Sequence, residues 1–338
     1  MPSPGDEPVF PVSLQDFRAW LLAAVEPSLA SVGVRRLGSG HSAGAWWVDV
    51  RGPGLERAMV AKLAPEPSVV LGRDVAAEGE LLDALHRSGA PVPAVLGIDG
   101  GDALGGTACF VMEPAVGTGV TDATPTGYYD DPALRALSAA EQGQVWESFQ
   151  DALIALHEVD VRQLPAGIRG RNGLGEVIAY WRTALLDVAP PAAVPRQLRL
   201  LDFVAEHLPD GAGHEPALCM GDARLANGIV SGAEVTTLID FEVAYIGDPA
   251  ADIAYSLMMD ELHRRSAASP LAFADSAQMW ERWTARTGRS AEHARYWTAF
   301  GAMILCVTAS RAMIIWGTPS DTIETVNPLV GVWERVAG

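Results

Sequence analysis

The segment at residues 220–227 reads Met-Gly-Asp-Ala-Arg-Leu-Ala-Asn, and it carries the strongest pattern in this chain. A second segment, Leu-Ile-Asp-Phe-Glu, follows at 238–242. Together they supply a carboxylate at Asp222, a carboxamide at Asn227 and a second carboxylate at Asp240. Oxygen ligands of this kind suit a hard cation such as Mg²⁺. The two segments therefore predict a metal-dependent site, with Asn227 and Asp240 as the metal ligands.

The spacing within residues 228–239 predicts how these groups come together. Two short β-prone runs flank Ser-Gly-Ala-Glu at 231–234, which predicts a hairpin that returns Asp240 beside Asn227. Phosphoryl transfer needs one carboxylate to orient the acceptor hydroxyl and further oxygen ligands to hold Mg²⁺ on the phosphates. We predict that Asp222 has the first role.

A D-x-x-x-x-N pair on its own more often marks two solvated loop residues. Here the pattern continues with Gly-Asp-Pro at 247–249. Asp248 is a good helix N-cap and Pro249 suits the first helical position, so we expect a helix over 250–259. The ordered set of loop, hairpin and helix favours a kinase-like site.

With these elements in order, the chain resembles the aminoglycoside phosphotransferase family, a branch of the kinase-like fold that includes choline and homoserine kinases. The family pattern is H-G-D-x-x-x-x-N, I/L-D-x-E and G-D-P-x-x-D-L-A. This chain has M-G-D-A-R-L-A-N, L-I-D-F-E and G-D-P-A-A-D-I-A. It departs from the family at Met220, where histidine is usual. The resemblance also implies that Asp252 braces the catalytic loop.

The resemblance implies an α+β, two-lobed fold of the protein-kinase type. We expect an N-terminal ATP-clamp lobe at 1–116, with an N-terminal helix, an antiparallel sheet and one further helix. We expect a larger, mostly helical catalytic and substrate-binding lobe at 117–338. The phosphoryl donor implied is ATP or another nucleoside triphosphate, bound with Mg²⁺.

A glycine-rich hairpin between β-prone runs at 32–36 and 45–50 is the predicted phosphate clamp. Glycines let backbone N–H groups approach phosphate oxygens closely. The strict G-x-G-x-x-G pattern is not met, because residue 43 is alanine. The predicted nucleotide contacts in this loop are Gly38, Ser39, Gly40, His41 and Ser42.

Lys62 lies in the apolar run Met-Val-Ala-Lys-Leu at 59–63, which is similar to the kinase strand whose lysine pairs with the α- and β-phosphates. Glu78 lies in a helical stretch and could face Lys62, with Glu80 as the competing candidate. The apolar run at 107–112 then leads into the segment that would be the hinge. Backbone groups near Glu113 and Ala115 would read adenine there.

Arg224 is a further catalytic candidate, because it stands two residues after Asp222. Its guanidinium could neutralise charge that develops on the transferred phosphoryl group. The alternative is that it pairs with a nearby carboxylate. Downstream of the hinge, Ser138 and Glu141 form a predicted capping box that opens a long helix. His157 at the end of that helix is predicted to cap or pack.

Composition bounds the function. The 338 residues carry a net charge of −18, which disfavours nucleic acids and membrane surfaces as partners. The three cysteines lack metal-ligand spacing and look like reduced core residues, and no signal-peptide pattern is present, so we expect a cytoplasmic protein. We also expect a monomer or a homodimer. The apolar run at 300–316 is interrupted by polar residues and predicts a buried helix.

The resemblance predicts an ATP- and Mg²⁺-dependent kinase that phosphorylates a small-molecule hydroxyl. An antibiotic is one candidate acceptor, in inactivation or self-resistance, and a primary metabolite such as a hydroxyacyl thioester is another. A nucleotide-binding pseudokinase module is the alternative, favoured by Met220 and the imperfect glycine loop. The acceptor pocket could be lined by aromatic residues, although such residues more often form core: Tyr180, Trp181, Trp280, Trp283, Trp297 and Trp316.

Overall fold

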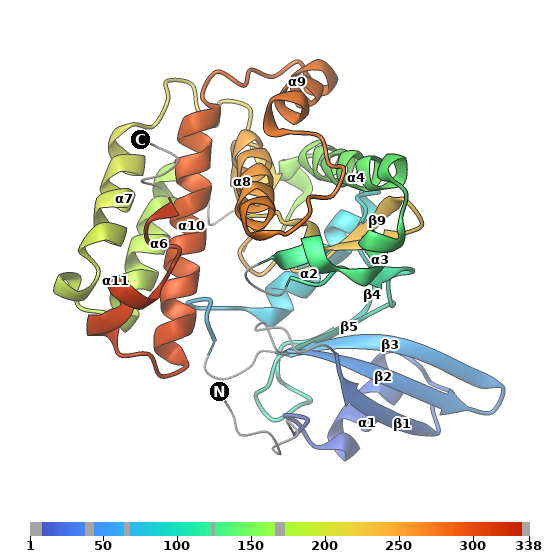
Figure 1. The fold of residues 1–338 in the computed structure, drawn as a ribbon. Coiled ribbons are helices and arrows are strands. Elements are labelled where there is room, and N and C mark those ends of the chain that lie inside the picture. Colours follow the sequence, from blue (N-terminus) through green and yellow to red (C-terminus); the bar gives the residue numbers. More distant parts are fainter. Residues whose placement is uncertain (1–8, 38–43, 64–67, 123–125, 166–172, 333–338) are drawn as a thin grey trace. The chain divides into compact units, whose positions relative to one another are not determined.

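The structure is a computed structural model that describes residues 9–37, 44–63, 68–122, 126–165 and 173–332. The chain forms two compact units, which Figure 1 traces along the sequence. The first contains residues 1–87 and 92–114, and the second contains residues 88–91 and 115–338. The predicted glycine-loop contacts at 38–42 lie outside the described residues.

The first unit is a five-stranded antiparallel sheet with strand order β1-β2-β3-β5-β4. One helix, α1 (Leu14–Ala24), buries Phe17 and Leu21 in the same core as Val48 of the sheet. A second helix, α2 (Val75–Arg87), contacts β4 and β5. The strands are β1 (Ser31–Arg36), β2 (Ala45–Gly52), β3 (Leu55–Leu63), β4 (Val95–Asp99) and β5 (Cys109–Met112).

Gly79 sets how closely α2 approaches the sheet. A Cβ atom at this position would lie 2.9 Å from Cβ of Phe110 on β5, so a larger residue would push the helix away. The preceding residue, Glu78, therefore lies close over the strands. The end of β3 is fully buried and contains Lys62, which pairs in register with Phe110. The packing of α2 thus brings a buried acid toward a buried base.

The second unit is mainly helical. Its longer helices are α4 (Ala139–His157), α6 (Leu174–Val188), α7 (Pro195–Glu206), α8 (Ala250–Ser266), α9 (Ser276–Thr287) and α10 (Ala294–Ile315). Its shorter helices are α3 (Pro132–Ala136), α11 (Ile323–Val326), η1 (Gly127–Asp130), η2 (Val161–Gln163), η3 (Pro191–Ala193), η4 (Leu225–Asn227) and η5 (Ser320–Thr322). The capping box of Ser138 and Glu141 is present at the start of α4, as predicted.

The described part of the second unit also contains five short strands: β6 (Thr118–Gly119), β7 (Ala217–Cys219), β8 (Gly228–Ser231), β9 (Glu234–Leu238) and β10 (Tyr245–Gly247). β7 pairs with β10, and β8 lies between β6 and β9. The β8–β9 pair is the hairpin expected from the sequence. The segment 220–227 connects β7 to β8, and Asp240 follows β9, so both lie at strand ends in this unit.

Helix α10 is long and apolar enough to cross a membrane by length and composition alone, but more than half of its apolar window is buried within the protein. It contacts α6, α7 and α8 and fully buries Phe300 and Met303. A buried, positively charged residue, Arg311, also lies on this helix. The buried helix expected over 300–316 is therefore a core helix of the second unit.

Candidate active site

The carboxylate of Asp222 is held from several directions. Oδ1 accepts a hydrogen bond from Oη of Tyr255 at 2.7 Å, and Oδ2 accepts one from Nδ2 of Asn227 at 3.1 Å. Oδ2 also lies 3.1 Å from Nε of Arg224. The Asp222 side chain keeps 22% exposure, which leaves room for a hydroxyl to reach it. These contacts fix the direction of the carboxylate.

Tyr255 on α8 is a contact that sequence reasoning missed. It is only 3% exposed, and burial together with the charge of Asp222 raises its pKa well above the ordinary value. The phenol therefore stays protonated and acts as a donor to Asp222. The available signal was its place three residues after Asp252, on the helix that the Gly-Asp-Pro segment opens.

The backbone of the loop at 220–227 is held by Asp252, as the family resemblance implied. Its Oδ2 accepts from the N–H of Met220 at 2.7 Å, and its Oδ1 accepts from the N–H of Gly221 at 3.0 Å. Nε2 of His157 lies 3.0 Å from Oδ2 of Asp252. His157 was expected only to cap or pack at the end of α4. Instead, it is a buried partner of the residue that supports the loop.

Position 221 requires glycine for two reasons, its backbone conformation and a close backbone neighbour. Its φ is +80°, and a Cβ atom would lie 2.7 Å from the carbonyl oxygen of Val243. The preceding residue, Met220, is fully buried. The backbone at residue 221 is therefore fixed by its conformation and by a close neighbour, as well as by Asp252.

Asp240 has a φ of 70°, a left-handed conformation that the described part of the chain shows at no other non-glycine residue. Such strain costs about 1–3 kcal/mol and often marks a functional position. The N–H of Ile239 donates to the carbonyl oxygen of Asn227 at 2.9 Å, which brings the ends of the two segments together. This contact produces the proximity that the hairpin predicted.

The side-chain oxygens of Asn227 and Asp240 fit a Mg²⁺ ion that is also coordinated by substrate oxygens. Nδ2 of Asn227 donates to Asp222, so its Oδ1 can act as a ligand on the other side. Among the described residues there is no cluster of three or more His, Cys, Asp or Glu side chains placed to hold a metal. One amide and one carboxylate, with phosphate oxygens completing the coordination, is a usual arrangement for Mg²⁺.

Arg224 forms the carboxylate pairing that the sequence left open. It makes an ion pair through Nη1 with Asp122 and a second through Nε with Asp222. Burial lowers the pKa of Arg224, but the charges of Asp222 and Asp122 outweigh that effect, so its pKa is raised. Oδ1 of Asp122 lies 3.3 Å from Nε2 of the buried His263. Neither Asp122 nor His263 was identified from the sequence.

The first unit contains the expected lysine–glutamate pair. Nζ of Lys62 lies 2.6 Å from Oε1 of Glu78, and both side chains are buried. The competing Glu80 is exposed. Nη2 of Arg73 lies 3.4 Å from Oε2 of Glu78, a contact without a signal in the sequence pattern. Glu78 therefore joins two buried cations.

At the expected hinge, Glu113 has backbone and side-chain partners within the first unit. Its N–H donates to the carbonyl oxygen of Ala94 at 2.9 Å, and its carboxylate pairs with Arg57 at 2.9 Å. Ala115 begins the main segment of the second unit.

Solved structures with the same fold are aminoglycoside phosphotransferases. A Ralstonia eutropha structure, itself assigned provisionally to these enzymes, has a TM-score of 0.70 at 20% identity and matches over 96% of this chain and 98% of its own. The Streptomyces rimosus enzyme APH(3'')-Id has a TM-score of 0.53 at 22% identity, over 87% and 98%. APH(4)-Ia, solved with AMP-PNP and hygromycin B, has a TM-score of 0.56 at 16% identity, over 95% and 97%. The kinase-like α+β fold expected from the sequence is confirmed.

The curated proteins with similar sequences are named as members of the acyl-CoA dehydrogenase family. Acyl-CoA dehydrogenase family member 10 of Mus musculus is 29% identical over 185 residues, 54% of this chain, and family member 11 of Gallus gallus is 27% identical over 235 residues, 67% of it. The match spans only 16% and 28% of those proteins. The model of the phosphotransferase enzyme family matches residues 33–288, which is more than half of the chain. This protein therefore belongs to the phosphotransferase enzyme family.

Proposed function

We propose that this protein is an ATP- and Mg²⁺-dependent kinase that phosphorylates an alcohol group of a small molecule. The observation that carries the proposal is the geometry around Asp222. Its carboxylate is fixed by Tyr255 and Asn227, remains partly exposed, and lies on a loop whose backbone is anchored by Asp252. A preset carboxylate of this kind suits a group that orients or deprotonates an attacking hydroxyl.

In the proposed reaction, the acceptor hydroxyl oxygen forms a bond to the γ-phosphorus of ATP. The bond from that phosphorus to the β–γ bridging oxygen breaks, and ADP leaves with the electron pair. Asp222 orients the hydroxyl and takes its proton. Bound Mg²⁺ would neutralise charge on the phosphates, with Asn227 and Asp240 as its protein ligands. Lys62, held by Glu78, would contact the α- and β-phosphates.

Arg224 has a supporting place in this proposal. Its guanidinium lies against Asp222 and Asp122, so it balances two carboxylates. We infer that Arg224 helps to hold the Asp222 carboxylate in place. Its contact with a transferred phosphoryl group would require it to release one of these partners.

The acceptor can be narrowed to two candidate classes. The first candidate is an antibiotic that phosphorylation inactivates. It is suggested by the aminoglycoside phosphotransferases, which share the fold at low identity. The curated relatives are named for acyl-CoA dehydrogenation, which favours a hydroxyacyl thioester as the second candidate. Three free cysteines, all buried, support a cytoplasmic location for either reaction.

The test is a phosphorylation assay with Mg²⁺ and ATP on aminoglycosides, macrolides, nucleoside antibiotics, amino alcohols and hydroxyacyl thioesters, followed by mass spectrometry. Gain of a phosphoryl group on one class, lost in Asp222→Asn, would support the kinase and identify its acceptor. ATP binding without phosphoryl gain on any class would favour the pseudokinase alternative. An unchanged product yield in Asp222→Asn would overturn the role of that residue.

A further inference from the structure

Asp122 lies between a buried histidine and the arginine that contacts Asp222. Its Oδ2 accepts a hydrogen bond from Nη1 of Arg224, and its Oδ1 lies 3.3 Å from Nε2 of His263 on α8. Nε of Arg224 lies 3.1 Å from Oδ2 of Asp222. The side chains of Asp122, Arg224 and Asp222 are all partly buried. One arginine therefore joins Asp122, on the segment before η1, to the carboxylate of the loop at 220–227.

The position of Asp122 is fixed by its surroundings. Asp131, which caps α3, accepts a 2.8 Å hydrogen bond from the N–H of the residue before Asp122. His263 is buried, and its ring packs edge-on against Tyr128 with the two centroids 4.8 Å apart. Gly127 has a φ of +52°, and a Cβ atom there would lie 2.3 Å from Nδ1 of His263. The carboxylate of Asp122 therefore faces a histidine that is tightly packed on η1.

The guanidinium of Arg224 directs its hydrogen bond to Asp122. Nη1 donates to Asp122, whereas Nε, the atom near Asp222, has no hydrogen-bond partner among the described residues. Asp222 is therefore close to the positive charge of Arg224 without accepting a directed bond from Nε.

This orientation leaves acceptor positions open on Asp222. An ionised carboxylate has about four such positions. Tyr255 and Asn227 each donate to one of them. A pair of parallel hydrogen bonds from a guanidinium, which is a frequent geometry between arginine and a carboxylate, would fill the rest. Because Arg224 is held by Asp122, these positions stay available to a hydroxyl.

We propose that Asp122 is a positioning residue, which holds the Arg224 guanidinium in an orientation that leaves Asp222 open to the acceptor hydroxyl. The inference rests on the proposed kinase function and assigns to Asp122 a role that acts through Arg224. Without the carboxylate of Asp122, the guanidinium turns onto Asp222 and fills the positions that the hydroxyl needs. Loss of Asp122 should therefore lower turnover and spare the affinity for nucleotide.

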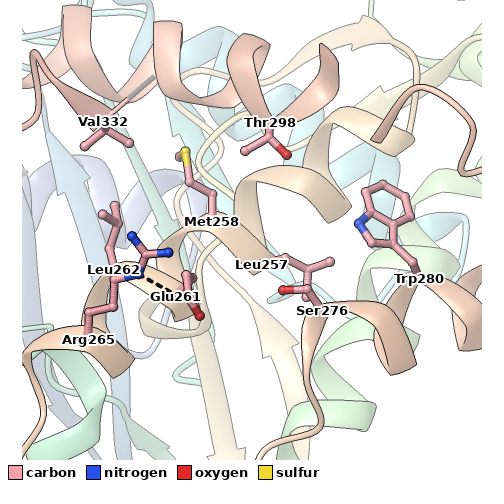
Figure 2. Close-up of a pocket in the computed structure, with 9 residues that line it drawn as sticks. All are labelled: Leu257, Met258, Glu261, Leu262, Arg265, Ser276, Trp280, Thr298 and Val332. Carbon is pink, nitrogen blue, oxygen red and sulfur yellow. Dashed lines mark hydrogen bonds and ion pairs between the residues drawn. The ribbon is translucent and has the colours of Figure 1, made fainter. Parts of the chain in front are cut away.

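Helix α8 also provides a matched control. Asp252 and His263 are about three turns apart and lie on one side of this helix. Glu261 and Arg265 lie on another side, which lines a cavity of about 250 Å³, as Figure 2 shows. Oε1 of Glu261 and Nε of Arg265 lie 2.7 Å apart there. Glu261→Gln therefore removes a carboxylate from an arginine on the cavity side of the helix.

Crystal structures of the native protein and of Asp122→Ala test the orientation of Arg224 without requiring turnover. We expect Arg224 to make two hydrogen bonds to Asp222 in the variant. Any other orientation, including the native one, would overturn the inference, whether or not the protein is a kinase. Asp122→Asn, which keeps the size of the side chain and removes its charge, takes the place of Asp122→Ala if that variant does not fold.

Release of ADP from Mg²⁺–ATP, with water as the acceptor, gives a kinetic test that needs no identified substrate. Asp122→Ala should lower kcat about tenfold and leave KM for ATP unchanged, because a bond between charged groups is lost away from the nucleotide. In an Arg224→Gln background, Asp122→Ala should change kcat less than about twofold, because the arginine through which it acts is absent. Glu261→Gln should keep the native kcat.

The outcomes separate this inference from the kinase proposal. Equal losses of kcat from Asp122→Ala in the native and Arg224→Gln backgrounds would show that Asp122 acts independently of Arg224 and would refute its positioning role. A similar loss in Glu261→Gln would refute it too, since net charge alone would then explain the effect. A native protein that neither releases ADP nor phosphorylates any compound would refute the kinase proposal, and the crystal structures would still decide whether Asp122 orients Arg224.

Discussion

Tyr255 donates a 2.7 Å hydrogen bond to Asp222 from the same helix that holds the loop backbone through Asp252. One turn of α8 therefore sets both the position of the loop and the direction of its carboxylate. The donor is buried and stays protonated, because burial and the neighbouring charge of Asp222 raise its pKa. This relationship makes Tyr255 a positioning residue whose loss should lower turnover.

Tyr255→Phe removes the donor and keeps the ring. We expect kcat to fall about tenfold, since a hydrogen bond to a charged group contributes about 1.5–3 kcal/mol. KM for the acceptor should change little, because Tyr255 orients the carboxylate and has no contact with the acceptor in the proposed reaction. Tyr296→Phe, which removes a hydroxyl bonded to the carbonyl of Val204, is the control. A kcat equal to that of the native protein would show that Tyr255 is only structural.

Asp222→Asn should remove most turnover, about 10²–10⁴-fold, because it deletes the proton acceptor. Nucleotide affinity should stay close to native, since this carboxylate acts on the acceptor hydroxyl. Steady-state kinetics and titration with a non-hydrolysable ATP analogue measure the two effects. A parallel loss of nucleotide affinity would assign Asp222 to nucleotide binding instead.

Asp240→Asn should weaken nucleotide binding only when Mg²⁺ is present, because the carboxylate is the expected metal ligand. Its left-handed backbone also tolerates asparagine well. Calorimetric titrations with and without Mg²⁺ test this, with Asp248→Asn as a control carboxylate at the start of α8. Equal affinities for the native and variant proteins in Mg²⁺ would contradict the metal assignment.

The buried ion pairs of Glu78 with Lys62 and Arg73 in the first unit predict which of two variants loses more free energy of unfolding. Glu78→Ala removes the carboxylate that Lys62 and Arg73 share, and removal of one partner from a buried ion pair costs about 3–5 kcal/mol. Lys62→Ala leaves Glu78 paired with Arg73, so it should destabilise the unit less. Urea denaturation of both variants measures the difference. A larger loss for Lys62→Ala would mean that the lysine, and not the glutamate, joins the three side chains.

His263 should contribute to stability in a pH-dependent way. Burial lowers its pKa, although Asp122 and Asp260 act in the opposite direction. The native state then binds fewer protons than the unfolded state below about pH 6.5, so the free energy of unfolding should fall as pH decreases through that value. His263→Gln should flatten this slope, whereas His293→Gln at an exposed site should not. Denaturation curves at several pH values measure the slope, and equal slopes in all three proteins would contradict the prediction.

Much of the fold was predictable because its signals are local. The turn at Gly232 between β8 and β9, the capping box at Ser138 and the proline at the start of α8 each act within a few residues. β4 was not predicted, since it is short and gains its place by pairing with β5 across a register shift. Helix α8 was expected to end near Met259 and continues to Ser266.

Residues of the candidate site could be predicted where a sequence motif fixes the spacing between them. Contacts that form only when distant segments pack together could not be predicted. Asp222 and Tyr255 are 33 residues apart, and Arg224 and Asp122 are 102 apart. No local pattern links such pairs, because their contact depends on where α8 and the segment before η1 meet the loop. For Arg224 the sequence allowed two roles, and the fold determines which carboxylates lie next to it.

The buried methionine at residue 220 has a consequence for how relatives of this protein are found in genomes. The loop backbone at that residue is held by Asp252, and the Met220 side chain only fills space. A search pattern that requires histidine before Gly-Asp would discard this chain and any relative with the same replacement. A pattern built on Asp222, Asn227 and Asp252 would retain them, because those side chains make the contacts that define the loop.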